Sequence, residues 1–333
     1  MSKKKGIPDF NFDFQDEDLQ QLFEPFNPPR KESAPDNLNN YPIVLAHGFA
    51  RPDFLIDSLF TTLNLSIYDF SFVSDRFHYF KGIASHLKKH GFSVFHSRVS
   101  WAADVRTRAK DLTAEINRIL DETGRDKVHI IAHSMGGLDA RAMIVYENMA
   151  SKIFSLTTIG TPHHGSVLAD YVLENGAEKI LGLLGNFVNL DGIGSLSTRE
   201  CYNFNIYSRQ YEATNDVIYQ AYYSSKNSEE IFVGFQPAEK LIREKQGDND
   251  GLVCVKSQKW QSELIYNKQV KKIRQRRFPI DADHLDQIGW WNLNEFHKAG
   301  WWNMAALREK NKNEEIIKNV YLKIAREVVG NKK

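Results

Sequence analysis

The chain has 333 residues, and 42% of them are hydrophobic, which is enough for the large core of an α/β domain. Lysine and arginine (43) almost balance aspartate and glutamate (42), so the net charge of +1 gives no electrostatic reason to expect a nucleic-acid partner. No apolar run is long enough to span a bilayer, and the first residues lack the apolar stretch of a secretory signal. The sequence therefore predicts a protein with no transmembrane segment that is either cytoplasmic or already trimmed, in which Cys201 and Cys254 are free thiols.

Residues 1–40 are rich in acids, asparagine and proline, a composition typical of an arm rather than of a folded domain. Residues 41–333 are expected to form a single domain. Within it, residues 50–78 are expected to be an insert, because their apolar residues show no clear helical or strand period. In this part, apolar runs of strand length alternate with apolar residues at helical spacing. The expected elements are strand 43–46, helix 80–87, strand 92–99, helix 105–119 ending at Gly124, strand 128–133, a helix after residue 134, and strand 153–159. This alternation predicts an α/β fold, a central and mostly parallel sheet with helices on both faces.

The remaining chain is less regular. Residues 167–190 are unusually apolar and predict two helices broken near Gly176. The wider segment 166–200 is either a helical lid or cap over a site or ordinary core packing. Further expected elements are strands 217–223 and 231–235, a solvated basic edge at 268–277, and an amphipathic helix at the end of the chain.

The segment 128–137 reads as a buried strand that runs directly into a turn of small residues with Ser134 at its tip. A nucleophile elbow needs this arrangement, because small residues two positions before and after the serine let a strand and a helix meet at a strained turn. Ala132 and Gly136 occupy those positions, although the first is more often glycine. We therefore expect Ser134 to be a catalytic nucleophile. His133 is excluded as its base, because the side chain before the nucleophile points away on such a turn.

The strand 43–46 ends at His47-Gly48-Phe49, where hydrolases of this kind place the loop that binds an oxyanion. We expect the backbone N–H groups of Phe49 and Met135 to donate to the negative charge that develops on a substrate carbonyl.

A serine nucleophile needs a base and an acid, which in this fold follow it along the chain in the order Ser, Asp or Glu, His. Of the eleven histidines, only His284 and His297 lie beyond the acidic loop at 248–250. His284 lies in a polar loop and is the expected base, whereas His297 reads as part of a helix surface. Asp250 lies at the mouth of an apolar run and is the expected acid, with Asp248 as the alternative.

With these residues in place, the sequence resembles the bacterial triacylglycerol lipases of the true-lipase type found in Pseudomonas, Burkholderia and Proteus. The matching segments are 42–45 with His47-Gly48, 133–141, 158–166, Gly194-Ser195-Leu196 with Phe204-Asn205, 249–253, and 284–286. They extend from residue 41 to the region of residue 290. The resemblance implies an α/β-hydrolase fold and hydrolysis of esters of long-chain acids, and it favours Asp250 over Asp248.

The resemblance also concerns a metal. That family binds a structural calcium through an acid two residues after the catalytic histidine, and Asp286 matches this ligand. The positions of two further ligands carry Trp290 and Gln236, so the resemblance implies only part of a calcium site. No cofactor is expected for catalysis.

The sequence thus predicts a serine hydrolase that cleaves carboxylic esters of acylglycerols through an acyl-enzyme formed by Ser134, His284 and Asp250. Its expected partner is a lipid or ester substrate, which can lie at a lipid–water interface. A short-chain carboxylesterase, a phospholipase or an acyltransferase would use the same triad. The alternative outside catalysis is a binding protein of the same fold that lacks activity.

Overall fold

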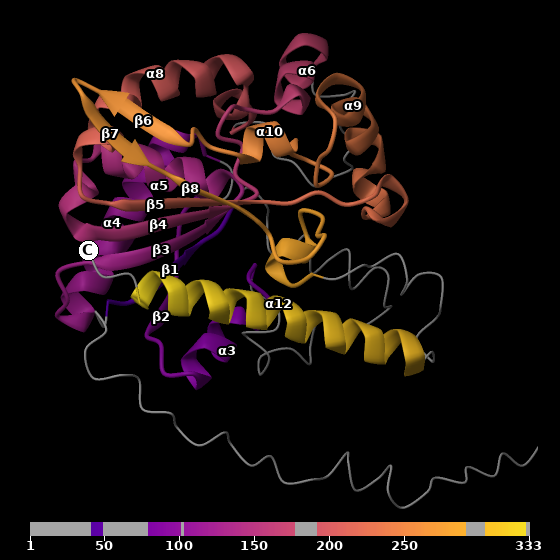
Figure 1. The fold of residues 1–333 in the computed structure, drawn as a ribbon, viewed down its shortest axis with the longest axis horizontal. Coiled ribbons are helices and arrows are strands. Elements are labelled where there is room, and N and C mark those ends of the chain that lie inside the picture. Colours follow the sequence, from indigo (N-terminus) through magenta and orange to yellow (C-terminus); the bar gives the residue numbers. More distant parts are fainter. Residues whose placement is uncertain (1–40, 49–78, 101–102, 177–191, 291–303, 331–333) are drawn as a thin grey trace, which may run out of the picture. The chain divides into compact units, whose positions relative to one another are not determined.

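A computed structural model of the chain describes residues 41–48, 79–100, 103–176, 192–290 and 304–330 (Figure 1). All of them belong to one compact unit, Asn37–Lys333. The predicted arm at 1–40, the insert at 50–78 and residues 177–191 of the lid candidate lie outside the described residues.

The centre of the unit is a six-stranded sheet in the order β2-β1-β3-β4-β5-β8. Its strands are β1 (Ile43–Ala46), β2 (Val94–His96), β3 (Val128–His133), β4 (Ile153–Ile159), β5 (Ile218–Tyr223) and β8 (Arg274–Arg277). Every neighbouring pair is parallel. The carboxyl ends of β1, β3, β4 and β5 therefore meet at one edge, the edge at which sheets of this class place their ligands.

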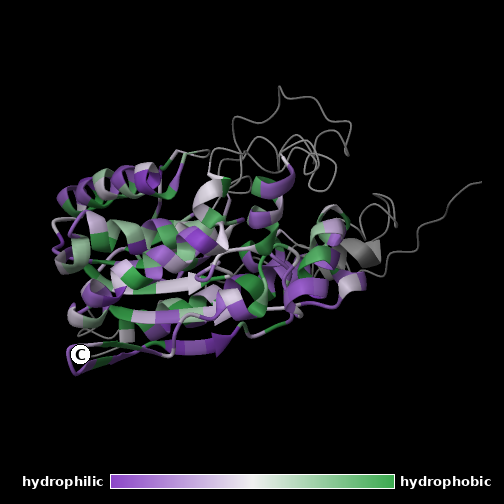
Figure 2. Cartoon of the chain, turned by 90° about the horizontal axis from the view of Figure 1, so that it is seen from above, coloured by the Kyte–Doolittle hydropathy of each residue, from purple (hydrophilic) through white to green (hydrophobic). Residues whose placement is uncertain are grey.

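Helices cover both faces of this sheet because its strands are apolar on both sides. Ile43 and Leu45 of β1 pack in one buried cluster, and Val44 and Ala46, which point the opposite way, pack in another. The helices α3 (Ile83–Lys89), α6 (Val167–Asn175), α9 (Gln236–Gln246) and α12 (Met304–Gly330) contribute to the first cluster. The helices α4 (Val105–Thr123), α5 (Met135–Tyr146) and α8 (Thr198–Thr214) contribute to the second. The predicted α/β fold with two covered faces is confirmed, and Figure 2 shows the apolar residues gathered between the layers.

Several helix boundaries follow the sequence signals. The side chain of Asp104 accepts the backbone N–H groups of Arg106 and Thr107 and caps the start of α4, an interaction worth about 1 kcal/mol. Gly124 ends the same helix in the left-handed conformation, with φ of 63°. The helix α6 ends at Gly176, where the sequence predicts a break.

The predicted strand at 231–235 is wrong. Val233–Phe235 forms a short 3-10 helix, η6, which leads into α9. Both Phe232 and Phe235 are buried, with ring centroids 5.3 Å apart. A spacing of three residues puts both rings on one side of a tight turn, whereas a strand would direct them to opposite faces.

The basic segment lies at the edge of the sheet, as predicted, and most of it is strand. An antiparallel hairpin of β6 (Glu263–Tyr266) and β7 (Gln269–Lys272) leads into the edge strand β8. Charged side chains on an edge strand discourage pairing with another chain. The other short elements are η2 (Met149–Lys152), η4 (Ile193–Leu196), η5 (Ser228–Glu230), α10 (Val255–Gln258) and η7 (Asp286–Ile288).

The two cysteines, Cys201 and Cys254, are buried free thiols. In the described part of the chain, no helix combines the length and the apolar character needed to cross a bilayer.

Candidate active site

Ser134 lies at the sharp turn between β3 and α5, at the carboxyl edge of the sheet. Its backbone has φ of 56° and ψ of −134°, a conformation that costs a residue with a side chain of the order of 1–3 kcal/mol. The turn is held by the Ser134 N–H, which donates to Ile159 O at 2.9 Å, and by Thr161 Oγ1, which donates to Ser134 O at 2.8 Å. Ser134 is partly exposed between buried neighbours, so the strained turn presents its hydroxyl to solvent.

The small residues around the turn have different roles. A Cβ atom on Gly136 would lie 2.6 Å from the backbone oxygens of both Ala46 and His47, so only glycine lets α5 start this close to β1. Ala132 is fully buried, and the structure accommodates its methyl group among the apolar residues beneath the sheet. The departure from glycine at position 132 is therefore compatible with the elbow.

Asp250 and His284 come from loops that follow different parts of the sheet, and the structure brings them together. Asp250 Oδ2 lies 2.8 Å from the ring nitrogen Nδ1 of His284. In addition, the backbone N–H of His284 donates to the backbone oxygen of Asp250 at 2.9 Å. The other oxygen, Oδ1, accepts the backbone N–H groups of Leu252 and Val253 at 3.1 and 2.8 Å. The carboxylate is thereby fixed, and it holds the imidazole through Nδ1, which leaves Nε2 as the ring nitrogen that could act on a nucleophile.

The His284 ring also lies against the residue before the nucleophile. The ring centroids of His133 and His284 are 4.4 Å apart. The described contacts include no hydrogen bond between the Ser134 hydroxyl and His284, and bonds of this kind are often long until substrate binds.

The alternatives for acid and base are separated by the same geometry. Asp248 has a side chain that is 75% exposed and pairs with Arg243 at 3.3 Å, whereas Nδ1 of His284 pairs with Asp250. His297 lies outside the described residues.

The structure describes one half of the predicted oxyanion site. Met135 is the first residue of α5, so its N–H has no acceptor within the helix. Phe49 lies outside the described residues, but Gly48 before it packs so closely that a Cβ atom there would lie 2.6 Å from the Ser134 Cβ. The buried guanidinium of Arg108 donates to the carbonyls of His47 and Gly48 at 2.9 and 3.3 Å and fixes this end of β1.

Sequence reasoning missed Gln287, a buried residue one 3-10 turn beyond His284. Its Nε2 donates to Asp250 Oδ2 at 2.9 Å, on the same oxygen that His284 uses. The only sequence signal was an amide three residues after the expected base, a spacing that puts both side chains on one side of a tight turn.

The surroundings of Asp286 do not fit the calcium site implied by the family resemblance. Asp286 Oδ2 accepts the Lys226 ammonium at 2.9 Å, and both side chains are buried. Burial alone lowers the pKa of Lys226, but the charges of Asp286 and Asp283 outweigh this effect and raise the pKa above its ordinary value. Calcium takes six to eight oxygen ligands. One Asp286 oxygen lacks a hydrogen-bond partner, yet no group of three acidic, histidine or cysteine side chains suited to a metal occurs among the described residues.

The two other aligned positions are engaged elsewhere. Trp290 is buried, and its indole N–H donates to Tyr79 O at 3.0 Å. Gln236 begins α9 and donates to Ile231 O at 3.5 Å.

Comparisons with known proteins identify the family and the fold of the chain. Residues 92–187 match the family described as PGAP1-like alpha/beta domain. The chain is 30% identical over 286 residues to Triacylglycerol lipase 2 of Saccharomyces cerevisiae, a match that covers 75% of this chain and 81% of the yeast protein. It is 34% identical over 159 residues to a triacylglycerol lipase of Burkholderia plantarii, covering 46% and 39% of the two chains. The structure of Bacillus licheniformis lipase BlEst2 in mature form is similar with a TM-score of 0.53 at 22% identity, covering 77% of this chain and 89% of that one.

A parallel sheet that delivers a serine on a strained strand-to-helix turn defines a serine hydrolase of the α/β-hydrolase fold. The chain belongs to the triacylglycerol lipase family, and it is a carboxylic ester hydrolase. The predicted resemblance to bacterial lipases is confirmed, and the yeast relative extends it beyond bacteria.

Proposed function

We propose that this enzyme hydrolyses acylglycerols with Ser134 as nucleophile, His284 as general base and acid, and Asp250 as the residue that orients the base. The observation that carries the proposal is the Asp250–His284 bond of 2.8 Å, formed next to a serine in strained backbone conformation at the same sheet edge.

The reaction follows from these positions. Because Nδ1 of His284 is bound to Asp250, Nε2 takes the proton of the Ser134 hydroxyl while the oxygen attacks the ester carbonyl. The N–H groups of Met135 and Phe49 stabilise the oxyanion, and a single donor of this kind typically contributes ~10²–10³ in turnover. His284 then gives its proton to the leaving alcohol, and water, activated by the same base, releases the fatty acid from Ser134.

Exposed apolar side chains on two helices, one of which begins at the loop that carries Asp250, support a lipid substrate. Ser166, which caps α6, donates to Leu252 O at 3.2 Å, so the start of this helix lies on the loop that carries Asp250. Farther along, α6 and the neighbouring α8 expose large apolar residues, namely Leu173 (58%), Tyr202 (65%) and Ile206 (55%). Apolar residues that stay in water in this way are suited to contact with acyl chains or a lipid surface.

The proposal includes the role of the cation at Asp286. The Lys226 ammonium, rather than a calcium ion, neutralises this buried carboxylate and holds η7, the turn that follows His284. A divalent cation would be repelled by an ammonium group that already occupies one carboxylate oxygen.

The test combines a serine variant with an ester series. Ser134→Ala should abolish hydrolysis of p-nitrophenyl esters and labelling by a fluorophosphonate, while Ser166→Ala, outside the triad, should still be labelled. Substrates from acetyl to long acyl esters, phospholipids and triacylglycerol emulsions, each with and without EDTA, then define the substrate class. Activity that is retained by Ser134→Ala would refute the mechanism, and a strict preference for acetyl esters or phospholipids would refute the acylglycerol assignment.

A further inference from the structure

A chain of buried side chains runs from the end of β1 to the acid of the proposed triad. Tyr79 Oη lies 2.7 Å from His133 Nδ1, and His133 Nε2 lies 3.0 Å from Gln287 Oε1. Gln287 Nε2 in turn donates to Asp250 Oδ2 at 2.9 Å. These residues are at most 6% exposed, and they come from four segments that are distant in the sequence.

The charge of Asp250 sets the direction of every bond in this chain. A carboxylate only accepts, so the Gln287 amide must direct its NH₂ group to Asp250 and its oxygen to His133. That oxygen accepts a proton carried by His133 Nε2. Burial, together with the neighbouring His284, holds the pKa of His133 well below its usual value, so the ring is neutral and has one N–H. Its Nδ1 is therefore an acceptor, and the hydroxyl that donates to it is that of Tyr79.

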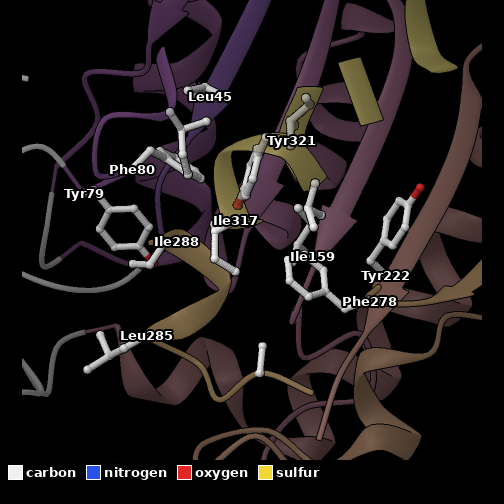
Figure 3. Close-up of a cluster of buried hydrophobic side chains, with 14 of the residues drawn as sticks. Leu45, Tyr79, Phe80, Ile159, Tyr222, Phe278, Leu285, Ile288, Ile317 and Tyr321 are labelled. Carbon is white, nitrogen blue, oxygen red and sulfur yellow. The ribbon is translucent and has the colours of Figure 1, made fainter. Parts of the chain in front are cut away.

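The far end of the chain is anchored beside the nucleophile. The Gly48 backbone packs against both groups, since a Cβ atom on Gly48 would lie 2.7 Å from the Tyr79 hydroxyl oxygen and 2.6 Å from the Ser134 Cβ. The Tyr79 ring lies in the buried apolar cluster beside Phe80 and Ile288, the latter on the same turn as Gln287 (Figure 3). This hydrogen-bond chain thus extends from the Gly48 backbone beside Ser134 to the carboxylate of Asp250, and it passes beside the His284 ring.

The fold leaves room for this hydrogen-bond chain at one glycine, Gly160. Gly160 has φ of 58°, and a Cβ atom there would lie 2.2 Å from Gln287 Oε1 and 3.3 Å from Asp250 Oδ2. Glycine at the end of β4 therefore lets the Gln287 amide reach both His133 and Asp250.

We infer that Tyr79, His133 and Gln287 are positioning residues, which act as one directed hydrogen-bond chain to hold Asp250, and through it His284, in register with Ser134. The inference rests on the proposed function of Asp250 and His284. Gln287 does this by sharing Oδ2 of the carboxylate with His284, so the oxygen cannot rotate away when the imidazole moves during the reaction. Tyr79 and His133 fix the orientation of the Gln287 amide.

Kinetics of single and double variants test the coupling. Gln287→Met keeps the length of the side chain and removes both bonds. We expect kcat to fall about 10–100-fold with KM within twofold, the range found for residues that orient the ligands of a metal site. Tyr79→Phe should lower kcat several-fold in the wild-type background. In the Gln287→Met background it should change kcat less than twofold, because the chain is already cut.

A matched control removes a buried tyrosine hydroxyl elsewhere. Tyr219 is 1% exposed, its hydroxyl accepts from Asn215 Nδ2 at 2.8 Å, and it takes no part in the described hydrogen bonds between Tyr79 and Asp250. Tyr219→Phe should leave kcat within twofold and combine multiplicatively with Gln287→Met. If the effects of Tyr79→Phe and Gln287→Met on kcat also simply multiply in the double variant, the inference is overturned.

A spectroscopic test is independent of activity. In protein labelled with ¹⁵N-histidine, the resonances that disappear in His133→Gln should have the chemical shifts of a neutral ring protonated at Nε2. These shifts should stay the same at every pH at which the protein is folded. A ring protonated at Nδ1, or an imidazolium, would overturn the direction of the chain.

These outcomes separate the inference from the function on which it rests. If Ser134→Ala is inactive and a folded Gln287→Met variant has wild-type kcat, the positioning role is refuted and the triad stands. If Ser134→Ala is active, the proposed function fails, and the histidine spectrum still decides whether the directed chain exists.

Discussion

Replacing Asp250 by asparagine tests the orientation of the base most directly. Oδ1 of Asp250 accepts the N–H groups of Leu252 and Val253. In Asp250→Asn the amide oxygen must stay on these two donors, because an NH₂ group there would leave both of them without an acceptor. The NH₂ group therefore faces Nδ1 of His284, which becomes an acceptor. The single ring proton then lies on Nε2, where the base needs a lone pair.

The size of the effect follows from this change of tautomer. The same substitution in a Ser-His-Asp hydrolase of another fold costs ~10⁴ in kcat with the geometry intact, equivalent to about 5 kcal/mol of transition-state stabilisation. The new NH₂ group also meets the Gln287 amide, a donor on the same side, so the amide must turn over and disturb the bond to His133. We expect a loss of at least this order in kcat with little change in KM.

The assay is steady-state hydrolysis of a p-nitrophenyl ester, with the melting temperature measured on the same samples. Asp248→Asn is the control, because this side chain is 75% exposed and pairs with Arg243. It should retain wild-type kcat. An Asp250→Asn variant that folds and stays within tenfold of the wild type would refute the assignment of Asp250, and a larger loss in Asp248→Asn would transfer the role to that residue.

Three further predictions concern stability. Lys226→Met leaves the buried Asp286 without its ion-pair partner and should lower the free energy of unfolding by about 3–5 kcal/mol. EDTA should leave the melting temperature of the wild type unchanged. A large shift of this temperature with EDTA would contradict the role of the ammonium group. Gly136→Ala puts a methyl group against two backbone oxygens and should cost about 1–3 kcal/mol in urea unfolding, while Gly194→Ala, with open space around its Cβ, should cost less than half as much. Burial lowers the pKa of His129 from 6.5 to about 4 in the folded protein, so as the pH falls the unfolded protein binds the proton first. The free energy of unfolding should therefore decrease by about 3 kcal/mol between pH 6.5 and pH 4. The free energy of unfolding of His129→Gln should depend less steeply on pH across this range, and an identical slope would contradict the prediction.

The sequence by itself determined the sheet, the elbow and the candidate triad. The periods of strands and helices are local patterns in the sequence. The small residues at 132 and 136 likewise predict a tight turn at Ser134 without knowledge of any distant contact. The order of triad residues along the chain, which the fold imposes, reduced eleven histidines to His284 and one competitor. The same local signals failed at Val233–Phe235, where an apolar run of strand length folds as a turn because two phenylalanines share one side of the core.

Only the tertiary structure decided which polar groups meet. Lys226 and Asp286 are separated by 60 residues, and His133 and Gln287 by 154, so no periodicity in the sequence relates them. Their pairing depends on parallel strands ending at one edge of the sheet, which brings loops from distant segments together. For the same reason only the structure shows that the Lys226 ammonium lies against Asp286, the one calcium ligand that the family resemblance matched, and that Tyr79, His133 and Gln287 connect to Asp250. A buried polar group must find a partner in the folded protein, and only the fold determines which partner is within reach.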